Sequence, residues 1–115
     1  MLGLAAGCST TITNLTPKQQ TRTPTGMYPF EVKWDSTQRS VQKDTIQAAV
    51  VIGMDTYPMQ RNPLVTNRWE TVVPIAPDKD MVHYRYKFDY EYLSIPHRKG
   101  NSKLSPPYTL KITEK

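Results

Sequence analysis

The sequence predicts an all-β protein in which two antiparallel sheets pack face to face as a sandwich. Three observations lead to this fold class. Apolar and polar side chains alternate with a period of two in several segments, as half-buried strands require. The chain contains ten prolines, which discourage long helices. Its 115 residues suffice for one domain and leave little room for a second.

The N-terminal half of the chain contains three of the expected strands. Residues 10–15 could form the first one. Residues 28–34 carry an aromatic or aliphatic side chain at every second position, and Pro29 puts the start of this strand at an edge or a bulge. Residues 46–52 are apolar on both faces apart from Gln47, which predicts a central strand covered on both faces by sheet and loop.

The C-terminal half contributes three more strands. Residues 68–75 direct Trp69 and the alternate side chains after it to one face, and prolines close the segment. The clearest strand is residues 82–92, where valine, tyrosine and phenylalanine alternate with polar and charged residues. Such alternation predicts a half-buried antiparallel strand whose aromatic face belongs to the core. Residues 108–113 alternate in the same way and form the last strand.

The expected connections are polar and rich in turn-forming residues: 16–26, 35–44, 55–67, 76–80 and 94–107. Strands at this spacing favour an immunoglobulin-like sandwich of about six or seven strands. The lone cysteine rules out a disulfide between the sheets, so the core must depend on large aromatic side chains. We expect these to be Trp34, Trp69, Phe88 and the tyrosines.

The composition excludes several function classes. Hydrophobic residues make up 37% of the chain and charged residues 22%, too much core material for disorder and too many charges for a membrane-spanning protein. One cysteine and two histidines leave little for a disulfide framework, a zinc site or nucleophilic catalysis. We therefore expect no cofactor and no metal.

The first eight residues, MLGLAAGC, place small apolar side chains directly before the single cysteine, and a Ser/Thr run follows it. This segment resembles the lipobox of bacterial lipoproteins. The resemblance implies that Cys8 carries the lipid, that residues 1–8 are the remnant of a signal segment, and that residues 9–115 form the sandwich domain. The alternative is an ordinary N-terminal tail with a chance cysteine.

A second resemblance spans residues 49–92. An apolar strand ending in glycine, a loop with Pro58-Met59, then RWE and the YRYKF strand follow in the order seen in immunoglobulin-like modules that bind glycogen and starch. In that family these elements are mostly scaffold, although the lysine, here Lys87, can approach the sugar. Asp55-Thr56-Tyr57 stands where the family has a sugar-stacking tryptophan, so the resemblance implies Tyr57 as its substitute.

The charged face of residues 82–92 has two interpretations. Asp89 and Glu91 lie two apart, as paired catalytic carboxylates could. Arg85 and Lys87 share that face, however, and offer ordinary ion pairs. We interpret the face as solvated rather than catalytic.

The remaining polar residues do not indicate catalysis or nucleic-acid binding either. His83 and His97 have no accompanying serine and acid pattern. Lysine and arginine together number fifteen against ten acids, a net charge of +5, but they are dispersed without interleaved aromatics, unlike nucleic-acid modules. We interpret these dispersed charges as serving solubility; the alternative is weak attraction to anionic lipid and polysaccharide phosphates.

Two functions therefore compete. We expect a lipoprotein of the bacterial cell envelope, anchored to the membrane by lipid on Cys8 and facing the periplasm or exterior. It acts without catalysis as a protein-interaction or structural module, using loops and strand edges to contact another envelope protein or a polysaccharide. The alternative is a carbohydrate-binding module with Tyr57 and Lys87 at the sugar. An enzyme is the least favoured interpretation, because no residue pattern supports one.

Overall fold

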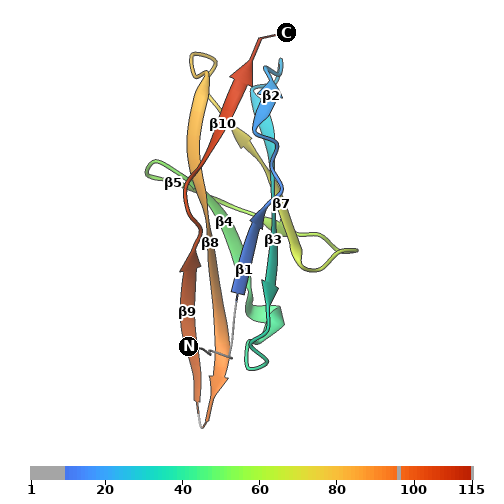
Figure 1. The fold of residues 1–115 in the computed structure, drawn as a ribbon, viewed down its shortest axis with the longest axis vertical. Helices are drawn as coiled ribbons and strands as arrows, with labels where there is room; N and C mark the ends of the chain where they lie inside the picture. The colour runs from blue at the N-terminus through green and yellow to red at the C-terminus, as the bar shows by residue number, and fades with distance from the viewer. Residues whose placement is uncertain (1–9, 96, 115) are drawn as a thin grey trace, which may run out of the picture.

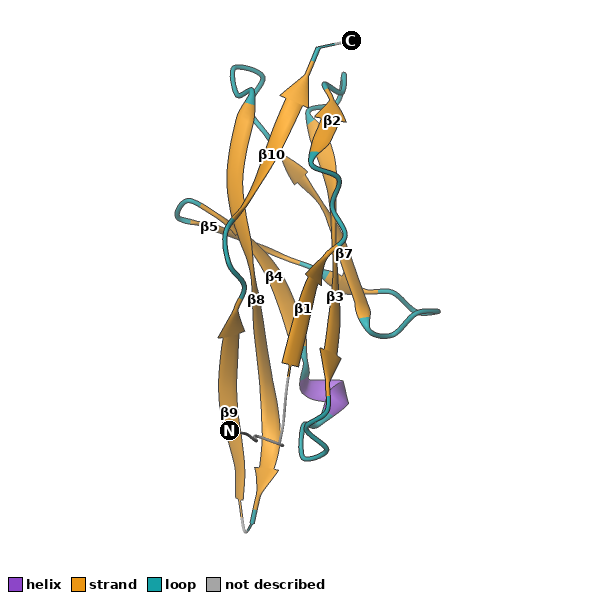
Figure 2. Ribbon diagram, viewed as in Figure 1, coloured by secondary structure: helices purple, strands orange, loops and turns teal. Residues whose placement is uncertain are grey.

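The computed structural model describes residues 10–95 and 97–114. These residues form ten strands and a single 3-10 turn, η1 (Lys43–Thr45), and the molecule is elongated along its strands (Figures 1 and 2). Two sheets face each other, so the expected all-β sandwich is confirmed.

The first sheet has the order β1-β3-β7-β6 and is antiparallel throughout. Its strands are β1 (Thr10–Asn14), β3 (Met27–Ser36), β7 (Arg68–Pro74) and β6 (Gln60–Arg61). The second sheet has the order β2-β10-β8-β4-β5, and β9 also pairs with β8. Its strands are β2 (Gln19–Thr21), β10 (Tyr108–Thr113), β8 (Met81–Ser94), β4 (Gln47–Ile52), β5 (Asp55–Pro58) and β9 (His97–Leu104).

The strand order is that of an immunoglobulin-like domain. Such domains place strands A, B, E and D in one sheet and C, F and G in the other, with C′ added beside C in the variable type. Here β1, β3, β7 and β6 occupy the A, B, E and D positions, and β5, β4, β8 and β10 occupy C′, C, F and G. The immunoglobulin-like fold class is confirmed by this topology.

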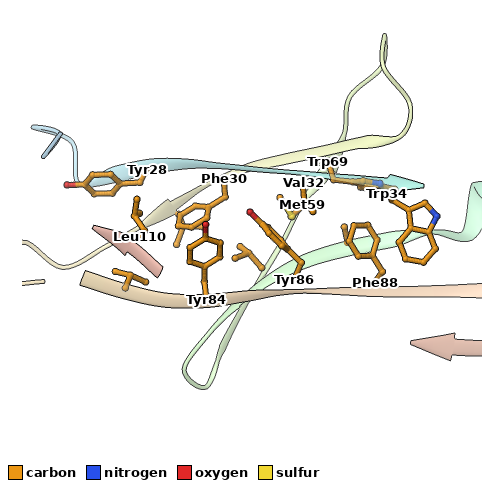
Figure 3. Close-up of a cluster of buried hydrophobic side chains, with 14 of the residues drawn as sticks. Tyr28, Phe30, Val32, Trp34, Met59, Trp69, Tyr84, Tyr86, Phe88 and Leu110 are labelled. Atoms are coloured by element: carbon orange, nitrogen blue, oxygen red, sulfur yellow. The ribbon is translucent and has the colours of Figure 1, made fainter. Parts of the chain in front are cut away.

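The core consists of the aromatic faces of β3 and β8, which point toward each other across the sandwich (Figure 3). The ring centroids of Phe30 and Tyr84 lie 4.9 Å apart, and those of Trp34 and Phe88 lie 4.6 Å apart. Trp69 on β7 is buried beside them. The core residues expected from the alternation of β8 are therefore confirmed from Val82 to Tyr90.

Polar groups also bridge the two sheets. The Tyr86 hydroxyl on β8 lies 2.7 Å from the hydroxyl of Thr16 and donates to Asn14 Oδ1 at 2.6 Å. The Asn14 amide donates to the Tyr84 hydroxyl at 2.8 Å. Burial raises the pKa of Tyr86 well above its usual range, and burial also raises the pKa of Tyr84. Both phenols are therefore neutral structural groups.

Three expected connections contain strands. Residues 16–26 include β2, residues 55–67 include β5 and β6, and residues 94–107 include β9, so His97 begins a strand rather than lying in a loop. The described strands consequently outnumber the six or seven expected. These strands were missed because their side chains show little burial: every residue of β9 is exposed, and a strand at a sheet edge needs only backbone pairing.

The structure also corrects the expectation that residues 46–52 are covered on both faces. Ala48 and Val50 are buried, whereas the alternate residues Ala49 and Val51 are partly exposed. No described element covers this outer face, as is usual for an antiparallel sheet. Gly53 then turns the chain into β5 with a φ of 61°, a conformation that glycine adopts easily.

Two further details position the site. Pro29 lies opposite Val72 on β7, and β1 pairs with β3 only from Val32 onward, so the expected edge position of Pro29 is confirmed. Strands β9 and β10 pair in succession with β8, separated by a break at Ser105. At this break the buried Ser105 hydroxyl accepts the backbone N–H of Tyr86 at 2.8 Å.

Candidate interaction surface

The hairpin of β8 and β9 extends beyond the rest of the sandwich (Figure 1). Residues 87–94 of β8 pair with residues 104–97 of β9. Within the described part of the chain, β8 is the one strand that pairs with β9. The opposite side of β9 is therefore a free sheet edge, eight residues long and exposed at every position.

The hydrogen bonds of β8 show which backbone groups of β9 face this edge. Glu91 accepts from the N–H of Gln42, and Leu93 donates to the carbonyl of Ser40, at 2.8 Å each. Because backbone groups alternate along a strand, the even-numbered residues of β8 point toward β9. The β9 residues paired with them are Lys99, Asn101 and Lys103. The residues of β9 whose N–H and C=O point to the free edge are therefore Arg98, Gly100, Ser102 and Leu104.

The side chains of β9 divide between two faces. Those of Lys99, Asn101 and Lys103 lie on the same face as Tyr92, Tyr90 and Phe88 of the core side, because cross-strand partners share a face. Asn101 donates to the Tyr90 hydroxyl at 3.1 Å. Lys99 and Lys103 are exposed, since the facing sheet does not extend over them.

The cations of β9 differ in their pairing between its two faces. On the outer face Arg98 forms an ion pair with Glu91 at 3.6 Å, and the neutral Ser102 hydroxyl bonds to Asp89. On the inner face neither Lys99 nor Lys103 has a carboxylate of the described residues within 4.0 Å. The free edge therefore has two uncompensated ammonium groups beside it, four residues apart on one face.

The structure does not bring Tyr57 and Lys87 together. Tyr57 on β5 lies opposite Val50 of β4, which lies opposite Tyr86 of β8, so Tyr57 faces the core and is half-buried against it. Lys87 lies opposite Ala49 and therefore points to the outer face of the same sheet. The sheet itself separates the two side chains.

The other residues considered from the sequence have ordinary partners. Asp89 lies 3.9 Å from Lys87, and Arg85 donates to the Ser105 carbonyl at 3.0 Å. His83 Nδ1 lies 3.0 Å from the Thr109 hydroxyl. These contacts fit a solvated strand face. Cys8 lies outside the residues that the structure describes.

Residues 10–95 and 97–114 contain neither a metal-binding cluster nor a helix that could cross a membrane. No three His, Cys, Asp or Glu side chains there come together as a metal site would need. That part of the chain also has no helix whose length and hydropathy suit a membrane crossing.

Sequence reasoning missed β9, although one signal pointed to it. The expected strand at residues 82–92 is much longer than the expected final strand at residues 108–113. Since a strand interior pairs along its whole length, the remainder of residues 82–92 needed another partner. The segment from His97 to Leu104 lies between two prolines and has no other assigned structure.

Comparison with known proteins adds one structural likeness. No protein-family model matches this chain, and no curated protein sequence matches it. A solved structure of murine CRIg aligns with 91% of this chain and 98% of its own, at 13% sequence identity and a TM-score of 0.44. The fold assignment rests on the strand order described above.

Proposed function

We propose that this protein is a membrane-anchored lipoprotein of the bacterial envelope that works as a non-catalytic binding module. Its binding surface is the free edge of β9. The observation that carries the proposal is an eight-residue strand that is exposed at every position and paired on one side. Such an edge accepts an extended segment of another protein as an additional strand.

The charges of β9 indicate what kind of segment fits. An added strand places its side chains beside those of β9, alternating between the same two faces. Lys99 and Lys103 would then lie beside two positions of the added strand that are four residues apart. Acidic side chains at these positions would neutralise both ammonium groups. We therefore propose an extended acidic segment as the partner.

The same lysines argue against a second copy of this chain as the partner. Two β9 edges brought together would bring the cations of both strands into proximity, and like charges in neighbouring strands are destabilising. Edge lysines commonly prevent such self-pairing. The edge is thus suited to an acidic segment and unsuited to itself.

Membrane anchoring through Cys8 is part of the proposal and rests on the lipobox resemblance. One structural relation supports it. Thr10, two residues after Cys8, lies opposite Ser36, the last residue of β3. This is the end of the sandwich beyond which the β8–β9 hairpin extends (Figure 1). A lipid on Cys8 would hold this end of the sandwich, and β9 with it, near the membrane.

A strand-addition experiment tests the binding surface. The probe is a synthetic ten-residue peptide of alternating valine and threonine with glutamates at two positions four apart, titrated into the full chain and followed by amide NMR. We expect shifts concentrated at β9, and weaker binding when Lys99 and Lys103 are both changed to Gln. A peptide with glutamine in place of glutamate is the control for charge.

Gly100 offers a matched pair of variants for the backbone contribution. Gly100→Pro removes an N–H that points to the free edge, whereas Gly100→Ala keeps it, and a Cβ at this position meets open space. We expect Gly100→Pro to weaken peptide binding about tenfold or more and Gly100→Ala to leave it nearly unchanged. Equal affinities for the two variants would refute strand addition at β9.

Fatty-acid labelling in a bacterial host tests the anchor separately. We expect the precursor to incorporate a fatty-acid analogue and Cys8→Ser to remain unlabelled. If neither protein is labelled and both stay soluble, the anchor is refuted, while the peptide experiment still decides the binding role.

A further inference from the structure

A cavity lies at the end of the sandwich where β3, β6 and β7 meet the connection before β4. Its volume is about 270 Å³. Trp34, Val41, Ile46 and Trp69 supply the apolar part of its wall. This volume lies just below that of sites for drug-sized ligands, about 300–1,000 Å³, so the cavity suits a molecule with a single ring.

Arg61 holds an oriented positive charge at this cavity. It lies opposite Trp69 in the pairing of β6 with β7, and its guanidinium carbon is 4.5 Å from the centre of the indole ring. Its Nη2 donates to the carbonyl of Lys43 at 2.6 Å. Two contacts therefore fix the guanidinium in place before any ligand arrives.

Among the described residues, Arg61 has neither a carboxylate to pair with its charge nor an acceptor for its Nε–H. Arg61 Nε is buried and has no hydrogen-bond acceptor among the described residues. No carboxylate in the described part of the chain forms an ion pair with Arg61. A buried donor without a partner is rare in a folded protein and requires an explanation. Nε itself is closed off from the cavity, but the guanidinium lines the cavity with its charge unpaired, and an anionic ligand there would compensate that charge.

The rim of the cavity adds both donors and acceptors. A second cationic residue, Lys43, and an acidic residue, Asp35, are among those that line the cavity. Asp35 accepts from the Asn67 amide at 3.2 Å and lies 3.6 Å from the ammonium of Lys33. The side-chain oxygen of the same amide, Asn67 Oδ1, has no hydrogen-bond donor among the described residues. Such a rim can bind a molecule that carries hydroxyl groups as well as an acid.

We propose that this cavity binds a sugar acid, a single-ring molecule with one carboxylate and several hydroxyl groups. Arg61 and Lys43 bind the carboxylate, Asp35 and Asn67 accept from the hydroxyls, and the apolar wall contacts the C–H surface of the ring. The site lies on the opposite sheet from the sequence-based sugar candidates Tyr57 and Lys87, and it does not depend on the proposed role of β9.

Titration with galacturonic acid tests the proposal, with galactose as the neutral sugar of matched ring. The full chain is followed through the indole N–H signals of Trp34 and Trp69 in the NMR spectrum. We expect galacturonic acid to shift both signals at millimolar concentration and galactose to bind at least about tenfold more weakly. Equal affinity for the two sugars, or no shift with either, overturns the proposal.

Three variants assign the charge recognition to residues. Arg61→Gln should weaken galacturonic acid binding about tenfold or more. Lys111→Gln, an exposed residue on β10, carries the same charge change and should leave binding unchanged. If Arg61→Gln does not fold, Lys43→Gln takes its place with the same expectation. Unchanged affinity in the folded variant refutes the assignment.

A further arm identifies the source of the acid. Trigalacturonic acid presents the same chemistry at the end of a chain. Tighter binding of the trimer than of the monomer supports a glycan end as the ligand, and equal binding supports the free acid. Binding of the monomer alone, with the trimer excluded, also supports the proposal and limits it to free acids.

Discussion

The clearest test of the sandwich core compares two neighbouring residues of β8, Phe88 and Lys87. Phe88 is 0% exposed, and its ring packs on those of Trp34 and Trp69, at centroid distances of 4.6 and 6.4 Å. Lys87, one residue away, points to the opposite face, and 47% of its side chain is exposed. The two positions share a strand and differ in which face they occupy.

The expected cost of Phe88→Ala follows from its burial. A buried phenylalanine removes about 150–250 Å² from water, which at about 25 cal/mol per Å² corresponds to about 4–6 kcal/mol. Alanine keeps part of this area, and a compact unfolded state reduces the difference. We therefore expect a loss of about 3–5 kcal/mol, a large share of a total of about 5–15 kcal/mol.

Lys87→Ala should behave differently. Its ammonium lies 3.9 Å from Asp89, and exposed pairs of this kind contribute less than about 1 kcal/mol after screening and side-chain entropy. The substitution therefore removes only this exposed ion pair and the partial cover that the lysine side chain provides.

Urea unfolding of the full chain, followed by tryptophan fluorescence and circular dichroism, measures both variants. At a slope of about 1.5 kcal/mol per molar urea, Phe88→Ala should lower the midpoint by about 2–3 M and Lys87→Ala by less than about 0.7 M. Equal shifts would mean that the faces of β8 are assigned wrongly or that no sandwich core lies beside Phe88.

Three other predictions concern the polar bridge and the sugar candidates. Thr16→Val should cost about 1–3 kcal/mol in the same unfolding assay, because its hydroxyl accepts the Glu31 N–H at 2.9 Å and contacts the Tyr86 hydroxyl; no measurable loss would argue against the bridge. Since burial raises the pKa of Tyr86, stability should hold up to about pH 10, the value of unfolded tyrosine, and fall above it as only the unfolded state releases its proton. Urea midpoints at neutral and alkaline pH test this, and Tyr86→Phe should flatten the decline. On a glycan array, specific sugar binding that is lost in Tyr57→Ala would overturn our preference for a protein partner.

How much of the fold the sequence predicts depends on which strands bury side chains. The strand at residues 82–92 was predictable because Tyr84, Tyr86 and Phe88 meet the facing sheet and the residues between them meet water. Strand β9 buries nothing, so its sequence carries no alternation and reads as a polar loop. Edge strands are formed by backbone pairing, which leaves little trace in side-chain pattern.

The candidate sites show a similar division. Tyr57 and Lys87 were chosen by spacing along the chain, but which face each occupies depends on the register of β4 with its two neighbours. A shift of one residue would reverse each face. Arg61 gave no signal at all in the sequence, because its unusual setting arises from Trp69 on another strand and from the Lys43 carbonyl.

The break at Ser105 separates β10, whose side chains are constrained by the core, from β9, whose side chains mostly are not. On one side, Ser105 is 1% exposed and held to Tyr86, and β10 then contributes Leu110 and Ile112 to the core. On the other side, every residue of β9 is exposed, and apart from Asn101, which donates to the buried Tyr90 hydroxyl, its substitutions should cost little stability. Selection can therefore alter the side chains of this edge freely while the domain stays folded. Closely related sequences would then share the scaffold and differ in the charge of this edge.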